Sequence, residues 1–343
     1  MKKYFFTAFI CIIIQQASGQ SFSHPVEYMN TIGDYYSQIK NDTWDYTRTV
    51  AHNKGGSKIE KKRLELLSTI SEAKKTVSKL PPFEGDKSYR DSVVSYLEIN
   101  YDVLNNDYAK IVDMEKIAEQ SYDLMEAYLL AQDLANDRLK LAANNLQESQ
   151  QIFANKFNIT LEEDADETTK KLEEADEMYK YYNKIYLVFF KSYKQEAYLI
   201  DAYSRADISA MEQNKNQLLE YSNDGLKTLR SMSAYRGDHS LLDKVINILI
   251  FYKEEAEKHA PKQIDFYLKK ERFENVKKAL DAKSENKRTK EDIDKYNQSL
   301  TEYNQSISEF NSINTELNGK RTNLYNAWNK TCQEFTSTHV QKR

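Results

Sequence analysis

Glycine and proline are scarce in this chain, with eight and four among its 343 residues. Ordinary proteins contain about 7% glycine and about 5% proline, and these two residues mark turns and interrupt helices. A chain with so few of them makes few turns, so its elements must be long. The sequence also sustains no alternation of apolar and polar residues, which excludes an extended β-sheet.

Cysteine is nearly absent as well, because the chain has only Cys11 and Cys332. Cys11 lies in an N-terminal segment that we expect to be removed, so one thiol would remain and no internal disulfide could form. Stability must then come from packing. We expect Cys332 to be a free, partly buried cysteine; the alternative is a dimer linked by a disulfide through Cys332.

The first residues, MKKYFFTAFICIIIQQASGQ, have the pattern of a secretory signal peptide, with two lysines, an apolar run and small residues at Ala17 and Gly19. The apolar run of about eleven residues is shorter than the roughly twenty that span a bilayer. We expect residues 1–19 to be a signal peptide and residues 20–343 to form the mature chain, exported to the periplasm or the cell surface. The segment Ala8-Phe-Ile-Cys11 lacks the small residues that a lipoprotein signal requires before its cysteine, so no lipid anchor is expected. No later apolar run predicts a transmembrane segment.

Neither sign of charge dominates, since 49 basic residues face 53 acidic ones. With this balance the chain lacks the excess of basic residues that is typical of nucleic-acid-binding proteins, so we expect no nucleic-acid partner. The patterns of hydrolases, metalloproteases and phosphate-binding loops are missing. Glu255 and His259 could share a helix face, but two ligands are too few for a metal ion. We therefore expect no catalytic residue, no metal and no cofactor; a hydrolase with an unrecognised site is the remote alternative.

The feature that the sequence does contain is apolar residues spaced alternately by three and four, which lie on one stripe of an α-helix. This spacing predicts an all-α fold, an elongated multi-helix bundle of long antiparallel helices. One polar or aromatic residue interrupts each stripe, as Arg321 does in the last. The stripes run through Met29–Val50, Ile59–Leu80, Leu97–Phe157, Leu172–Tyr193, Met211–Leu229 and Tyr296–Trp328.

Several breaks between these stripes contain residues that typically end, kink or cap a helix. Gly55–Gly56 and Pro81–Pro82 should end helices, and Pro261 should interrupt or kink one. The polar linker 283–290 leads to the last helix, which Thr289 and Asp292 would cap. His52 should lie at a helix end, where a cation is favoured. In residues 158–167, NITLEEDADE, we expect a capping box of Thr160 and Glu163; a calcium site is the alternative, without the glycine turn it needs.

The chain resembles itself at an offset of 152 residues. Residues 75–99 align with residues 227–251, and both contain the corner aromatic-x-Gly-Asp-x-Ser. We interpret this as an internal repeat, with half one at about 25–157 and half two at about 166–337 in a single body. Gly237 should end a helix and Asp238 should cap the next one. Arg236 has Glu84 as its counterpart, so we interpret Arg-Gly-Asp as a helix corner; a receptor-binding loop is the alternative.

Two stretches are unusually rich in apolar and aromatic residues, 179–203 and 241–252. We interpret both as central helices of the bundle, because they are too short and too charged to cross a membrane. Tyrosine suits such a core, since its ring is buried while its hydroxyl reaches a partner. A membrane-inserting hairpin of a pore-forming protein is one alternative for the two stretches. A binding surface of exposed tyrosines is another for residues 179–203.

The segment His52-Asn-Lys, the run Lys58-Ile-Glu-Lys-Lys-Arg63 and the corner Gly85-Asp-Lys-Ser-Tyr-Arg90 together resemble an uncharacterised family of bacterial exported surface proteins. This resemblance implies export and a cell-envelope location, and it implies no activity. Long amphipathic helices without a catalytic pattern favour an interaction or scaffold protein that binds another envelope protein or itself. A membrane-active helical protein is the alternative.

Overall fold

The computed structural model describes residues 22–52, 56–161 and 167–340, and these residues form an all-α structure. Within them the chain makes eight helices, if the two π-helical segments are counted as parts of the helices that they join, and no strand. Their bounds are α1 Pro25–Ala51, α2 Gly56–Val77, α3 Ser88–Asp102, η1 Val103–Asp107, α4 Tyr108–Ala118, α5 Tyr122–Lys156, α6 Glu167–Ser204, α7 Ile208–Arg230, α8 Ser240–Glu254, η2 Glu255–His259, α9 Ala260–Asp281, the 3-10 turn η3 Glu285–Lys287 and α10 Lys290–His339.

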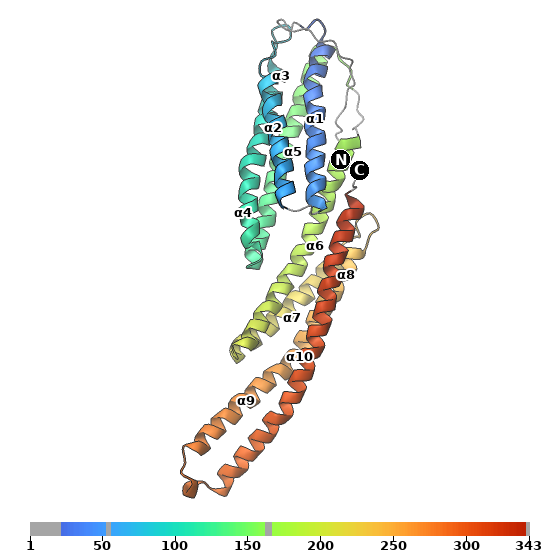
Figure 1. The fold of residues 1–343 in the computed structure, drawn as a ribbon. Helices are drawn as coiled ribbons and strands as arrows, with labels where there is room; N and C mark the ends of the chain where they lie inside the picture. Colours follow the sequence, from blue (N-terminus) through green and yellow to red (C-terminus); the bar gives the residue numbers. More distant parts are fainter. Residues whose placement is uncertain (1–21, 53–55, 162–166, 341–343) are drawn as a thin grey trace. The chain divides into compact units, whose positions relative to one another are not determined.

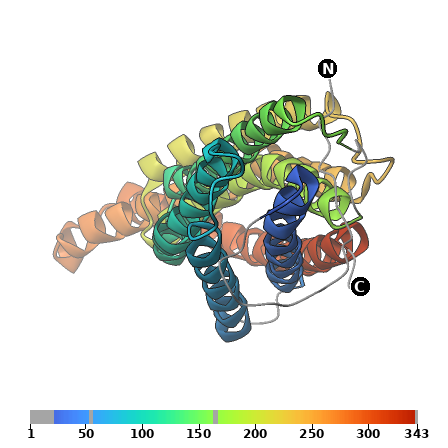
Figure 2. The ribbon, with the colours of Figure 1, turned by 90° about the horizontal axis from the view of Figure 1, so that it is seen from above.

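The chain divides into two compact units, residues 1–180 with 336–343 and residues 181–335. In the first unit α1 packs on α2, α2 packs on α3, and α5 runs back along α3 and α4 (Figures 1 and 2). The stripe predicted for α1 and α2 is confirmed over most of its length. Its buried members are Met29, Ile32, Tyr36 and Ile39 on α1 and Leu66, Ile70, Ala73 and Val77 on α2.

The predicted continuous stripe from Leu97 to Phe157 is wrong in one respect. The helix ends at Ala118, and α5 starts at Tyr122 and reverses direction (Figure 1). Ser121 caps α5, because its hydroxyl accepts a hydrogen bond from the backbone N–H of Leu124 at 3.2 Å. The reversal contains neither glycine nor proline, so the usual signals of a turn are missing there.

The second unit contains the greater part of α6, with α7, α8, η2, α9 and most of α10. The aromatic stretch of α6 is core here, since Ile185, Phe189 and Phe190 are buried. The run 241–252 on α8 is core too, and Leu241, Val245, Ile248, Leu249 and Tyr252 are fully buried. No helix in the described part of the chain is long and apolar enough to cross a membrane.

Helices α9 and α10 form a hairpin (Figure 1). Aromatic rings pack between the two helices. Phe266 stacks on Phe310 with ring centroids 4.2 Å apart, and Phe273 stacks on Tyr303 at 5.4 Å. The stripe predicted for α10 is displaced in part: Ser299, Ser306 and Ile313 are buried in place of Leu300, Ile307 and Asn314. The capping of α10 is confirmed, since the Thr289 N–H donates to Asp292 and the Asp292 N–H donates to Thr289.

The two Gly-Asp corners have the same local structure. Glu84 and Gly85 take φ values of 48° and 82°, while Arg236 and Gly237 take 50° and 86°. Two left-handed residues in sequence make a type I′ turn, which glycine favours at its second position. The left-handed conformation expected of the two glycines is confirmed. The expectation that each glycine ends a helix is wrong, because α2 ends at Val77 and α7 at Arg230, and a tight turn separates each of them from the next helix.

The aspartate of each corner accepts a hydrogen bond from the first backbone N–H of the next helix, as predicted. Asp86 Oδ1 accepts the backbone N–H of Ser88 at 2.7 Å, and Asp238 Oδ1 accepts that of Ser240 at 2.8 Å. Each corner also carries an aromatic ring against a phenylalanine. Phe83 meets Phe153 at 6.1 Å, and Tyr235 meets Phe335 at 5.9 Å, both edge to face. The arginine of the tripeptide therefore occupies a backbone position that Glu84 fills equally well.

Candidate functional site

A buried group of charged side chains lies inside the second unit. Arg321 on α10 donates from Nε to Glu196 Oε1 at 2.5 Å and from Nη2 to Glu255 Oε1 at 2.9 Å. Glu196 and Glu255 are 2% and 1% exposed, so both carboxylates are removed from water. Tyr325 donates its hydroxyl to the other oxygen of Glu196. Three helical segments, α6, η2 and α10, thus meet at one guanidinium.

This cluster holds one cation for two carboxyl groups. Burial raises the pKa of Glu255 well above its ordinary value near 4.5, the nearby charge of Glu196 raises it further, and Arg321 opposes both. Oxygen Oε2 of Glu255 is buried and has no hydrogen-bond partner among the described residues. A neutral, protonated Glu255 fits these surroundings, because an unpaired charge would be costly there.

Tyrosines surround the cluster. The hydroxyls of Tyr252 and Tyr325 lie 2.6 Å apart, and burial raises the pKa of both side chains. A tyrosine with a raised pKa keeps its proton and acts as a hydrogen-bond donor. The cluster therefore joins α6, η2 and α10 through a polar network. It shares no residue with the lining of the groove between α7 and α8, which includes Leu226, Arg230 and Ile250.

An exposed apolar face lies on the other unit, along α5. Leu130, Leu134 and Leu141 are 55%, 57% and 61% exposed. Residues four and eleven positions apart share one side of an α-helix, so the three leucines form one stripe that we call the α5 leucine face. The opposite side of α5 carries the buried Leu129, Ala142 and Leu146 that pack into the first unit. The helix is thus apolar on two sides, one of them facing solvent.

Three of the histidines lie at helix ends and not at one common site. His52 is the C-cap residue of α1, as predicted, while His24 and His239 precede α1 and α8. Glu255 turns to Arg321, and no group of three or more possible ligands for a metal ion occurs in the described ranges. The predicted capping box of Thr160 and Glu163, the alternative calcium site and the signal peptide fall wholly or partly outside the described residues.

Cys332 is partly buried and forms no disulfide. Burial raises the pKa of its thiol to about 11, which keeps the sulfur in its unreactive protonated form at neutral pH. This surrounding does not favour the disulfide-linked dimer, which stays a prediction. The alternative of a membrane-inserting hairpin gains no support from the runs on α6 and α8, because much of both runs is buried in the second unit.

Sequence reasoning missed the buried cluster, although a signal was present. Arg321 interrupts an apolar stripe, and the spacing that ends at Tyr193 leads in one more step to Glu196. A charged residue on the inward side of a helix requires a buried partner. The third member, Glu255, could not be paired in this way, because the π-helical segment changes the register of its helix.

No protein-family model matches this chain, and comparisons with curated proteins and with solved structures find no similar chain. Function must therefore be inferred from the geometry of this chain alone.

Proposed function

We propose that the protein is an exported, non-catalytic interaction protein of the bacterial envelope. It binds an apolar helical face of another envelope protein, or of a second copy of itself, through the α5 leucine face. The observation that carries the proposal is the row of Leu130, Leu134 and Leu141, each more than half exposed on a helix whose other side is already packed.

The α5 leucine face is suited to helix docking. Leucines at i, i+4 and i+11 spacing are the anchors that one amphipathic helix offers to another. Burying one such side chain contributes about 1.5–3 kcal/mol, so three of them provide a substantial part of a stable interface. Leu130 and Leu134 stand one turn apart, and Asp137 and Arg138 are exposed between Leu134 and Leu141. Exposed apolar side chains that gather on one face can mark an interaction site.

The proposal is tested with Leu134→Glu and Leu141→Glu combined, against Leu64→Glu and Leu268→Glu combined. Leu64 and Leu268 are 53% and 49% exposed on α2 and α9, outside the α5 leucine face. Capture from envelope extracts and sedimentation of the pure protein measure binding to a partner and to itself. The wild-type chain and the control variant should bind alike, and the α5 variant should lose at least about tenfold in affinity. Wild-type protein that stays monomeric and captures no partner would refute the proposal, as would equal losses in both variants.

Export is part of the same proposal and has its own test. The pattern of residues 1–19 supports cleavage after Gly19. Protein recovered from the envelope fraction should begin at Gln20. An intact N-terminus on protein recovered from the cytoplasm would refute export and leave the α5 leucine face unaffected.

We also propose that the two units descend from a duplicated helical module with an offset of 152 residues. The matching bounds of η1 and η2, which differ by 152 at both ends, support this proposal, as do the two alike corners. A π-helical segment is uncommon, and its occurrence at the same register of both modules is hard to obtain from packing alone. Each module should then fold when it is expressed by itself; two fragments that remain unfolded would count against independent modules.

A further inference from the structure

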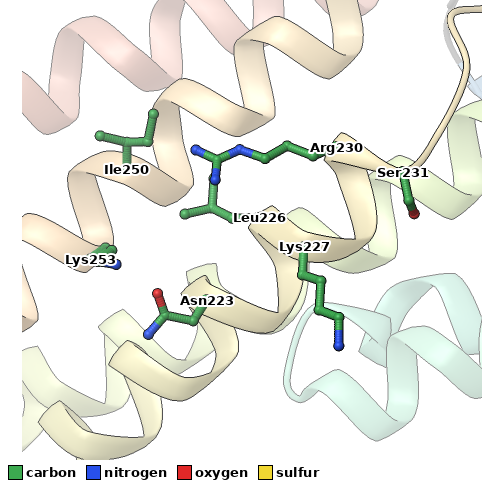
Figure 3. Close-up of a pocket in the computed structure, with 7 residues that line it drawn as sticks. All are labelled: Asn223, Leu226, Lys227, Arg230, Ser231, Ile250 and Lys253. Carbon is green, nitrogen blue, oxygen red and sulfur yellow. The ribbon is translucent and has the colours of Figure 1, made fainter.

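A shallow groove of about 490 Å³ lies between α7 and α8 in the second unit (Figure 3). Leu226 and Ile250 give it an apolar floor, and Ile250 is 44% exposed. Three cationic side chains belong to its lining, Lys227 and Arg230 from α7 and Lys253 from α8. Figure 3 shows that the Arg230 side chain extends over the groove toward Ile250. The remaining lining residues are Asn223 and Ser231.

The charges of this groove are unusual for this chain. Arg230 and Lys227 form no ion pair within the described residues, and Lys253 reaches Glu257 only at 3.7 Å. Eight other arginines of the described residues pair with carboxylates. They are Arg48, Arg63, Arg90, Arg138, Arg205, Arg272, Arg288 and Arg321.

The helix dipole explains only part of this pattern. Lys227 and Arg230 stand in the last turn of α7, where basic residues are favoured by the partial negative charge of the helix end. That effect does not explain Lys253, which comes from the neighbouring helix. It also does not explain the exposed Ile250, one turn of α8 before Lys253.

We propose that this groove binds an acidic amphipathic peptide segment of a partner protein. An apolar side chain of the segment would contact Leu226 and Ile250, and its carboxylates would pair with Arg230 and Lys253. Arginine is suited to this role because its planar guanidinium binds a carboxylate through two hydrogen bonds. This surface lies on a different unit from the α5 leucine face, so the inference does not rest on the proposed function.

A protein segment fits the groove better than a polyanion does. Nucleic acids and anionic membranes are held by extended arrays of cations, since each phosphate contact contributes little alone. This groove provides three cations on a chain whose formal charge is −4. Its apolar floor would also be left uncovered by a polyanion.

The test uses the full chain and a fluorescent helical peptide with leucine and glutamate on one face, with binding measured by anisotropy. The groove variant is Arg230→Gln with Lys253→Gln. The control is Lys277→Gln with Lys278→Gln, which removes the same charge from exposed lysines near the end of α9. We expect the groove variant to bind at least about tenfold more weakly and the control to bind within about twofold of the wild type. Ile250→Ser should weaken binding as well, by about threefold to tenfold.

Four results would overturn the inference. The wild-type chain does not bind the peptide, or it binds a version with lysine in place of glutamate equally well. The control variant loses as much affinity as the groove variant. Heparin or anionic vesicles bind more tightly than the peptide and with the same dependence on Arg230, which would assign the groove to polyanions. Circular dichroism of each variant establishes that a loss does not come from unfolding.

Discussion

The two π-helical segments carry opposite chemistry at the same register. Val103 begins η1 and Glu255 begins η2, at an offset of 152 residues, and both side chains are buried. Val103 packs among apolar neighbours that include Leu139 of α5. Glu255 instead meets Arg321 of α10 and Glu196 of α6. The same backbone irregularity is thus filled by hydrocarbon in one unit and by charges in the other.

This difference shows that the local backbone does not require a charge there. A buried ion pair contributes little net stability, because removing both charges from water offsets most of their attraction. An apolar core of similar volume is often equally stable or more stable. We therefore interpret the cluster of the second unit as a device for specificity, which fixes how α6, η2 and α10 meet.

The largest difference in stability between the two units is expected for Arg321→Met. It leaves Glu196 and Glu255 buried without a cation, so the second unit should lose about 3–5 kcal/mol in the free energy of unfolding. Leu139→Met at the apolar site of the first unit is the matched control and should cost less than about 1.5 kcal/mol. Urea titrations followed by tryptophan fluorescence separate the units, since Trp44 lies in the first and Trp328 in the second. Equal losses in both variants would contradict the buried-charge argument.

A second test replaces the charged cluster of the second unit by apolar side chains like those around Val103 in the first unit. The triple variant Glu196→Met, Glu255→Val and Arg321→Leu should recover the wild-type free energy of unfolding or exceed it by about 1–4 kcal/mol. Trp328 fluorescence in a Trp44→Phe background reports the second unit alone. A triple variant less stable than Arg321→Met would show that the charges contribute net stability.

A smaller effect is expected at the contact between the second and third helices of each unit. Gly225 on α7 stands 152 residues after Ala73 on α2, and a methyl group at Gly225 would lie 2.7 Å from Leu249 Cδ1 and 3.0 Å from Val188 Cγ1. Gly225→Ala should therefore cost about 1 kcal/mol, because overpacking exceeds the gain in helix propensity. The reverse change, Ala73→Gly, should also cost about 1 kcal/mol. A stabilised Gly225→Ala variant would show that α8 moves away easily.

The smallest expected effect is on pH dependence, where the units should differ in sign. The pKa of Glu255 is raised, so the folded second unit binds a proton more strongly, and its stability should fall as the pH rises from about 4.5 toward that raised pKa. In the first unit the pKa of Asp86 is lowered to about 2, chiefly by its hydrogen bond with Lys156. That contribution should be lost as the pH falls from 3.8 toward 2.

Urea titrations at several pH values, with Trp44 and Trp328 read separately, measure these two slopes. Glu255→Gln should flatten the slope of the second unit, and Asp86→Asn that of the first. Slopes of the same sign in both units would contradict the assigned pKa directions.

The sequence by itself determined the helical class and several helix ends, because these depend on local chemistry. The three- and four-residue spacing selects the inward side of each helix, Pro81–Pro82 follow the end of α2, and Asp86, Asp238 and Asp292 mark helix starts. Only the tertiary structure decided which helix each inward side meets. The reversal at Ser121 has no glycine or proline to announce it, and the shift to Ser299 and Ser306 on α10 follows from close packing. Glu196, Glu255 and Arg321 are far apart in the chain, and folding alone brings them together, because a buried charge is stable only beside its partner.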